Sequence, residues 1–182
     1  MENQRIRLSK KMLKDALIDL LQINLIEKIT VYEICERAQI NRTTFYKYYG
    51  SQYDLLDDIE ADIFKELEVL LSTDDPANDD GLTRTLRYIE QEHKKCQLLA
   101  NSTTDKKFGE KLFNLPVIKT QVEKIALREY KNAEIEYIHT FIYLGGYAII
   151  QRWINKEERE SPEEIAQLTR KLMFKIVSPA TL

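Results

Sequence analysis

Glycine and proline are scarce in this sequence, whose 182 residues include only 5 Gly and 4 Pro. The chain is instead rich in Leu, Ile, Glu and Lys, a composition typical of helical proteins. It shows no alternating strand pattern, no internal repeat, no low-complexity tract and no glycine-rich phosphate loop. The helix-forming composition and the missing strand pattern together predict an all-α fold.

Cysteine and histidine are also few. Cys35 and Cys96 are too few for a disulfide framework, and we expect reduced thiols and a cytoplasmic location. His93 lies three residues before Cys96, but two ligands do not make a zinc site. Residues 72–81 are a loop that lacks the ligand spacing of a calcium site. With no nucleophile elbow either, we expect no metal, no cofactor and no enzyme activity.

Long apolar runs are missing as well. The longest uncharged run, residues 137–151, is shorter than the roughly 20 residues that a membrane span needs. Residues 1–11 carry charges with no apolar run behind them, unlike a signal peptide. We therefore expect a soluble protein without a membrane partner.

The charges are unevenly distributed. Residues 1–50 carry nine Lys and Arg against six Asp and Glu, although the whole chain has a net charge of −3. A basic N-terminal part on an acidic body indicates a localised contact with an anionic partner.

Apolar spacing and capping residues predict the helices. The first begins at Ser9 as N-cap, and a capping box of Thr30 and Glu33 opens the next. Ser51 and Asp54 begin a long helix, whose charged residues, Glu60 among them, lie mostly outside its apolar stripe. Further helices are expected near 82–100, 105–114, 117–131 and 134–155, and after the N-cap Ser161.

Residues 29–51, ITVYEICERAQINRTTFYKYYGS, have the layout of a helix-turn-helix. Asn41 caps the second helix, and Phe45 and Tyr49 face inward at helical spacing. That spacing turns Arg42 and its polar neighbours outward. Arg suits guanine, whereas Lys, Tyr and Thr suit phosphates. On spacing alone, a solvated helix hairpin with a charged face is the alternative.

The amino-acid sequence of this stretch resembles that of the DNA-binding domain of the TetR family of bacterial transcriptional regulators. The resemblance covers about residues 8–60, and the matching positions are Ile29, Thr30, Val31, Ile34, Ala38, Thr44, Tyr46, Tyr48, Ser51, Leu55 and Leu56. The sequence departs from the family pattern at Cys35 for Ala, Gln39 for the turn Gly and Gln52 for Lys. Gln39 in a left-handed turn would be strained.

The resemblance implies an N-terminal three-helix DNA-binding domain over residues 1–50. A larger helical dimerisation and ligand-binding domain over 51–182 would follow, joined by the long helix that starts near 51. It also implies base contacts by Arg42, Thr43 and Tyr32. Backbone contacts are implied for Thr44, Tyr46, Lys47, Tyr48 and Gln52.

The same resemblance implies a homodimer on double-stranded DNA with an inverted-repeat operator, and regulation by a small-molecule effector or a partner protein. The interface residues expected are Tyr143, Gly146, Ile150, Leu168 and Leu172. The aromatic and histidine residues expected to line an effector pocket are Tyr88, His93, Phe113, Phe141, Tyr147 and Trp153. Residues 88–153 loosely resemble the C-terminal domain of regulators of dihydroxyacetone kinase operons. The alternative function is a helical adaptor that acts through protein–protein contacts.

Overall fold

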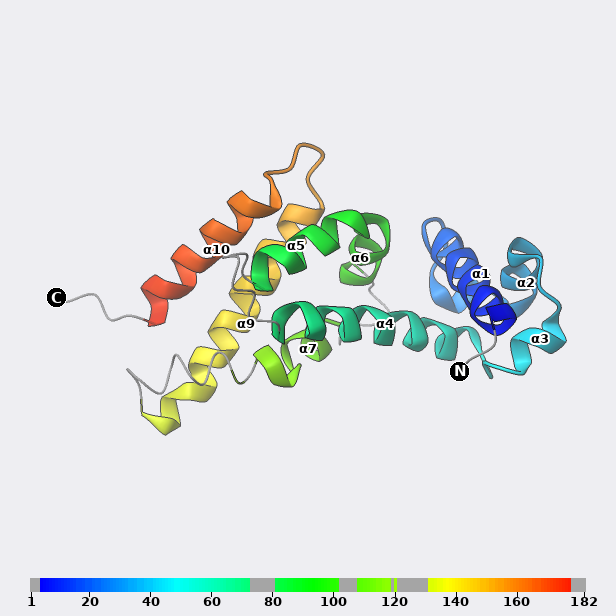
Figure 1. Ribbon diagram of the computed structural model, residues 1–182, viewed down its shortest axis with the longest axis horizontal. Helices are drawn as coiled ribbons and strands as arrows, with labels where there is room; N and C mark the ends of the chain where they lie inside the picture. The colour runs from blue at the N-terminus through cyan, green and yellow to red at the C-terminus, as the bar shows by residue number, and fades with distance from the viewer. Residues whose placement is uncertain (1–3, 73–80, 102–107, 119, 121–130, 178–182) are drawn as a thin grey trace. The chain divides into compact units, whose positions relative to one another are not determined.

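The computed structural model describes residues 4–72, 81–101, 108–118, 120 and 131–177. Within these ranges the regular elements are helices and no strand occurs, which confirms the all-α prediction (Figure 1). Backbone contacts divide the chain into two compact units. Of the described residues, those up to Ile63 form the first unit, and those from Phe64 onward form the second. The domain boundary expected at residue 50 remains a prediction, because the first unit extends into the long helix.

The first unit is a small helical bundle. Its helices are α1 (Gln4–Leu21), the short η1 (Ile26–Lys28), α2 (Val31–Ala38), α3 (Arg42–Tyr46) and the first half of α4 (Gln52–Ser72). α1 packs on α2, and α2 packs on α3. Leu13, Leu17, Ile34 and Phe45 are fully buried. The apolar stripes of the helices therefore meet in one core, as their spacing predicts.

The start of α1 differs from the expectation. Ser9 is not an N-cap, because α1 is already helical at Gln4 and the Ser9 hydroxyl donates to the carbonyl of Arg5 at 2.9 Å. Residues ahead of Ser9 lack an apolar stripe. The hydrophobic periodicity from which the helix was predicted therefore begins several residues after the helix itself.

In α4, Leu56, Ile59, Ile63 and Leu67 are buried and form the apolar stripe of the helix. Glu60 is a correction, because its side chain is only 2% exposed although the pattern put it on the outer face. Residue 60 follows directly after Ile59, so the buried face is wider than the apolar stripe alone. A carboxylate in that position is one of the features that sequence spacing does not reveal.

The second unit contains α5 (Gly81–Gln91), α6 (His93–Ala100), α7 (Phe108–Phe113), α9 (Asn132–Ile154) and α10 (Pro162–Val177). The single helix expected near 82–100 is broken at Glu92, where the backbone leaves the helical region with φ −96° and ψ 28°. The two pieces pack on different partners, α5 on α10 and α6 on α9 (Figure 1). Most of the helix expected over 117–131 lies outside the described residues.

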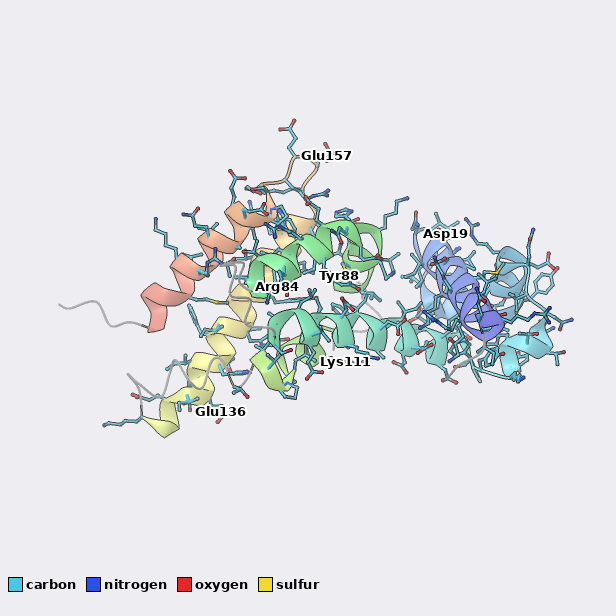
Figure 2. All side chains as sticks on the ribbon, in the orientation of Figure 1. Asp19, Arg84, Tyr88, Lys111, Glu136 and Glu157 are labelled. Atoms are coloured by element: carbon cyan, nitrogen blue, oxygen red, sulfur yellow. The ribbon has the colours of Figure 1, made fainter. Side chains whose placement is uncertain are left out.

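Polar contacts join α6 to α9. The Tyr147 hydroxyl and the Gln151 side-chain amide both donate to the Ala100 carbonyl at 2.9 Å. At the next turn, Asn101 and Asn155 exchange amide hydrogen bonds of 2.6 and 3.0 Å. Glu157 points outward from the turn between α9 and α10 (Figure 2). No helix within the described residues is both long and apolar enough to cross a membrane.

Candidate nucleic-acid interface

The turn between α2 and α3 is built by local hydrogen bonds. Thr30 and Glu33 form the expected capping box, in which the Thr30 amide donates to the Glu33 carboxylate at 2.8 Å. At the other end of α2, Gln39 adopts the left-handed conformation with φ 53°. Asn41 then caps α3 by accepting from the Thr43 amide at 2.8 Å. The helix-turn-helix prediction is thereby confirmed in its local geometry, including the turn at Gln39 that lacks the usual glycine.

One face of α3 anchors the helix to the core. Phe45 is 0% exposed and Tyr49 is 6% exposed, with ring centroids 5.6 Å apart. The Phe45 ring also meets the edge of the Tyr46 ring at 5.5 Å. These aromatic contacts hold the orientation of α3, so its remaining side chains face a defined direction.

The other face carries the residues expected to contact DNA. Arg42, Thr43 and Lys47 are exposed, as are Tyr46 at the end of α3 and Tyr32 on α2. Thr44, Tyr48 and Gln52 are half-buried. All eight candidate residues therefore keep accessible surface, on α2, on α3, in the turn that follows α3 or at the start of α4.

Arg42 also influences the core beneath it. Burial raises the pKa of the Cys35 thiol, and the positive charge of Arg42 partly offsets that rise. The guanidinium therefore lies within electrostatic reach of α2 while its side chain is exposed. This position leaves its five donor hydrogens available for an external acceptor.

A polar network fixes α1 and α4 around the C-terminal end of α3. The Tyr49 hydroxyl donates to Asp58 at 2.6 Å, and the Lys14 ammonium lies 2.9 Å from Asp58 and 2.6 Å from Asp62. Burial disfavours the charges, but these hydrogen bonds outweigh it. They raise the pKa of Lys14 and lower the pKa of Asp58. The network therefore ties α1 and α4 to the segment that follows α3.

Sequence reasoning missed one residue of this surface. Lys10 of α1 has its ammonium nitrogen 5.8 Å from the centroid of the Tyr48 ring, and Lys47 lies at the same distance from that ring. The only sequence signal was the basic start of α1, where Lys10 looks like any solvated lysine. Tertiary packing brings it beside the end of α3.

Comparison with known proteins decides the family. Residues 78–175, more than half of the chain, match the family model TetR_C_8, described as "Transcriptional regulator C-terminal region". The chain belongs to the TetR family of transcriptional regulators. The sequence resemblance at the N-terminus and the family match at the C-terminus together cover both units.

Two curated relatives illustrate how similar this TetR-family chain is to known proteins. It is 25% identical over 85% of its length to the uncharacterised HTH-type transcriptional regulator YxbF of Bacillus subtilis. It is 33% identical over 46% of its length to DhaS, an HTH-type dhaKLM operon transcriptional activator of Lactococcus lactis. These matches cover 42% and 44% of the two curated relatives, less than half the length of either.

The fold agrees with that of solved TetR regulators. The structure of a TetR transcriptional regulator from Streptococcus agalactiae superposes with a TM-score of 0.66 at 22% identity. That match covers 93% of this chain and 96% of the other. It supports the helix-turn-helix followed by a helical C-terminal part.

In this TetR-family chain, the residues expected to line a pocket have diverse surroundings. His93 Nε2 lies 2.8 Å from the Ile154 carbonyl and 2.7 Å from Arg159 Nη1. Trp153 is 2% exposed, and its indole nitrogen donates to the Glu160 carbonyl at 2.8 Å. The Tyr147 hydroxyl is bound to Ala100, as described above. These polar atoms close contacts within the chain, so their role in a pocket remains a prediction.

The other three pocket candidates lie on three different helices. Tyr88 is half-buried on α5, and Phe141 is 59% exposed on α9. Phe113 belongs to α7, but its side chain lies outside the described residues. Phe141 therefore has the exposure of a surface residue rather than that of a pocket wall.

The residues expected at the dimer interface divide in a similar way. Leu168 and Leu172 on α10 are 46% and 40% exposed, as an interface requires. On α9, Gly146 is buried, so it offers no surface to a second copy, and Tyr143 and Ile150 are half-buried. The face that α9 exposes instead is formed by Tyr137, Phe141 and Leu144, which are 77%, 59% and 58% exposed. We call these three residues the α9 face.

Proposed function

We propose that this protein is a sequence-specific DNA-binding transcriptional regulator that binds an inverted-repeat operator as a homodimer. The observation that carries the proposal is the two-sided character of α3. Its inner side is locked by Phe45 and Tyr49, while Arg42, Thr43 and Lys47 stand exposed on the outside. Such a helix fits the major groove, where exposed donors meet base edges and phosphates.

The exposed residues suit two kinds of DNA contact, contacts to base edges and contacts to phosphates. Arg42 at the start of α3 suits two hydrogen bonds to a guanine, and Thr43 offers a methyl group and a hydroxyl to the neighbouring base. Tyr32 on α2 extends the contact to an adjacent base. Lys47, with the hydroxyls of Thr44, Tyr46 and Tyr48 and the amide of Gln52, suits phosphates, which set the register without reading sequence. Tyr46 serves twice, because its ring packs on Phe45 while its side chain stays 51% exposed.

A second copy of the chain is the proposed occupant of the α9 face. α9 and α10 pack on each other within one copy, and together they expose the α9 face, Leu168 and Leu172. A methyl group built at Gly145 would meet nothing within 4 Å, so two helix backbones have room to approach there. Isologous pairing of this surface would give a two-fold dimer, whose two α3 helices match an inverted repeat.

Regulation is the third part of the proposal. An effector, either a small molecule or a partner protein, would bind the second unit and shift the operator affinity. It can do so only if it binds the operator-competent and operator-incompetent states with different affinities. The family match over residues 78–175 supports a regulatory role for this unit.

The proposal is tested by selection from a random duplex library at about 0.15 M salt, a physiological ionic strength. We expect enrichment of one inverted repeat, bound by two copies of the chain and lost when Arg42 is replaced by Ala. Titration at rising salt should weaken binding steeply, because phosphate contacts release counterions.

Enrichment of no sequence would overturn the proposal. Binding of a protein partner that is insensitive to salt and to Arg42→Ala would instead favour a helical adaptor. Selection should be repeated with cell extract present, so that a regulator requiring an effector still enriches its operator.

A further inference from the structure

One residue of the helix-turn-helix holds a backbone conformation that its side chain disfavours. Among the described residues, Gln39 is the one non-glycine with a positive φ, at φ 53° and ψ 39°. In this left-handed region the Cβ atom of any residue other than glycine crowds the following carbonyl oxygen. Strain of this kind persists only where the surrounding structure imposes it, and it gathers at functional sites. A side chain at this position therefore needs a physical reason.

The turn itself does not require a side chain at position 39. The Gln39 amide donates to the Glu36 carbonyl at 3.2 Å, and the Ile40 amide donates to the Cys35 carbonyl at 3.0 Å. Both bonds close the end of α2 through backbone atoms, so a glycine would form them without the strain. The backbone therefore gives no reason for a glutamine.

The interior of the protein gives no reason either. The Gln39 side chain is exposed, and within the part of the chain that the structure describes its side-chain amide makes no hydrogen bond. A buried or hydrogen-bonded side chain would offset the cost of the left-handed backbone inside the folded chain, and this one does not. The amide is therefore available in full to a partner outside the chain.

Gln39 lies between the two segments that the proposed function assigns to base reading. It follows Tyr32 of α2 by seven residues, close to two helical turns, and its backbone amide still bonds to carbonyls of α2. The backbone at position 39 therefore continues the face of α2 that carries Tyr32. Arg42 of α3 follows three residues later, so the two Cα atoms are at most about 11 Å apart. That span equals about three base-pair steps of the duplex.

The chemistry of this end of α2 favours a base over a phosphate. Glu36 is exposed three residues before Gln39, and its carboxylate repels a phosphate placed nearby. A phosphate also offers only acceptors, so the oxygen of the Gln39 side-chain amide would have no partner there. The major-groove edge of adenine offers one acceptor, N7, and one donor, the N6 amino group. Together they match a glutamine amide in a bidentate pair.

We propose that Gln39 reads an A·T base pair in the major groove, beside the bases read by α3, and that its strained backbone is retained for this contact. This inference rests on the proposed function and deepens it, because it gives the turn of the helix-turn-helix a role in sequence recognition. A glycine at position 39 would relieve the strain but would present no group to the groove. The first unit therefore gives up some stability in favour of specificity on DNA.

The test compares variants on the operator selected with the wild-type protein. Affinities are measured for that operator and for every single-base variant of it. Gln39→Ala should lower the affinity by at least about fivefold for each half-site, and it should abolish the preference for A·T at one position of the half-site. That position should lie within about three base pairs of the position whose preference Arg42→Ala relaxes.

Two further substitutions separate the side chain from the strain. Gln39→Gly removes both, whereas Gln39→Ala removes the amide and keeps the Cβ atom. The two variants should lose the same affinity and the same base preference, although Gln39→Gly should unfold at a higher temperature. Gln39→Glu replaces the donor by an acceptor. The preference at that position should therefore shift from adenine towards cytosine, whose amino group donates to a carboxylate.

Gln91→Ala is the matched control. Gln91 is exposed at the end of α5 in the second unit, and the substitution removes the same atoms. Its affinity and base preference should equal those of the wild type. Thermal unfolding of every variant shows whether loss of folding accounts for a loss of binding.

The outcomes separate this inference from the proposed function. If the wild-type protein enriches no duplex, the proposed function fails and this inference falls with it. If the protein binds an operator and Gln39→Ala keeps the affinity and the base preference, base reading by Gln39 alone is overturned. A uniform loss of affinity at unchanged base preference would indicate a phosphate contact or a structural role, and would also overturn it. A loss confined to Gln39→Gly would do the same, because that pattern follows the backbone rather than the amide.

Discussion

The two units of this protein expose surfaces of different chemistry. In the first unit, α3 and its neighbours present Arg42, Lys47 and several hydroxyls around an aromatic anchor. In the second unit, α9 presents Tyr137, Phe141 and Leu144 to solvent. A surface of cations and donors suits a polyanion, whereas a stripe of apolar side chains suits burial against another protein surface. The comparison shows that one helical chain exposes two surfaces of different chemistry, and each surface suits a different kind of proposed partner.

The two surfaces also differ in how they are specified. The first depends on local devices, namely the capping box at Thr30, the left-handed turn at Gln39 and the cap at Asn41. The second depends on which side of α9 the rest of its unit covers. Variants that act on only one of these surfaces therefore separate them.

The largest effect is expected at the α9 face. Phe141→Glu would bury an uncompensated charge in the dimer, which costs about 3–5 kcal/mol. The dimer dissociation constant should rise by at least about 100-fold, as measured by sedimentation. Val69→Glu is the control, because Val69 is 54% exposed on α4 outside this face. A Phe141→Glu protein that remains as dimeric as the wild type would place the interface elsewhere.

The next effect concerns the reading surface. Arg42→Ala should weaken binding to the selected operator by about 1–3 kcal/mol and relax the preference at one base pair. The measurement compares affinities for the operator and for single-base variants of it. Arg37→Ala is matched in type, but Arg37 pairs with Asp19 at 3.0 Å on the surface of α1 and α2. It should change affinity far less, and equal losses at both positions would argue against base reading by Arg42.

A smaller effect is expected at the turn. Gln39 has φ 53°, a conformation that glycine adopts without the clash of a Cβ atom. The left-handed conformation costs a residue with a Cβ atom about 1–2 kcal/mol, and the extra chain entropy of glycine offsets about 0.5–1 kcal/mol of the relief. Gln39→Gly should therefore stabilise the first unit by about 0.5–1 kcal/mol, measured by denaturant unfolding. Gln39→Ala keeps the Cβ atom and should give no comparable gain. If Gln39→Gly lowered the stability, the left-handed turn would carry no backbone strain with the glutamine side chain in place.

The smallest effect is a pH dependence in the first unit. Hydrogen bonds from Tyr49 and Lys14 outweigh burial and lower the pKa of Asp58, so its contribution to stability is fully present above the unfolded value of about 4. That contribution is lost as the pH falls through the lower folded-state pKa. Asp58→Asn should remove this acid-dependent part, which is no more than about 1 kcal/mol because the carboxylate is 34% exposed.

The measurement is the free energy of unfolding from pH 6 down to the acid range for both proteins. Asp15→Asn, at an exposed site on α1, is the charge-matched control and should follow the wild type. Parallel curves for the wild type and Asp58→Asn would show that the network contributes no acid-dependent stability.

Local features of the helix-turn-helix were predictable because neighbouring residues decide them. Thr30 and Glu33 are three apart, which is the spacing of a capping box, and Asn41 directly precedes the helix that it caps. Phe45 and Tyr49 are four apart and share one face. In each case the physical interaction spans less than two helical turns, so a short stretch of sequence contains both partners.

Other features depend on parts of the chain that are far apart. The helix breaks at Glu92 although no glycine or proline stands there. The break lets α5 pack on α10 and α6 pack on α9. The burial of Glu60 and of Gly146 depends on what packs against α4 and α9. The candidate pocket residues are aromatic or histidine side chains on predicted helices. Hydrophobic periodicity does not show whether other helices cover one side of such a helix or two, so it does not show which of these side chains line a cavity.

By itself, the sequence determined the helical class, the capped turn ahead of α3 and the residues that this short helix turns outward, because short-range hydrogen bonds and helical spacing decide all three. Tertiary structure alone decided that Lys10 and Lys47 lie over the same Tyr48 ring, and that α9 exposes Phe141 while it buries Gly146. The physical reason is that burial and charge proximity are properties of packed helices, and packing joins residues whose separation in sequence carries no information about their distance in space.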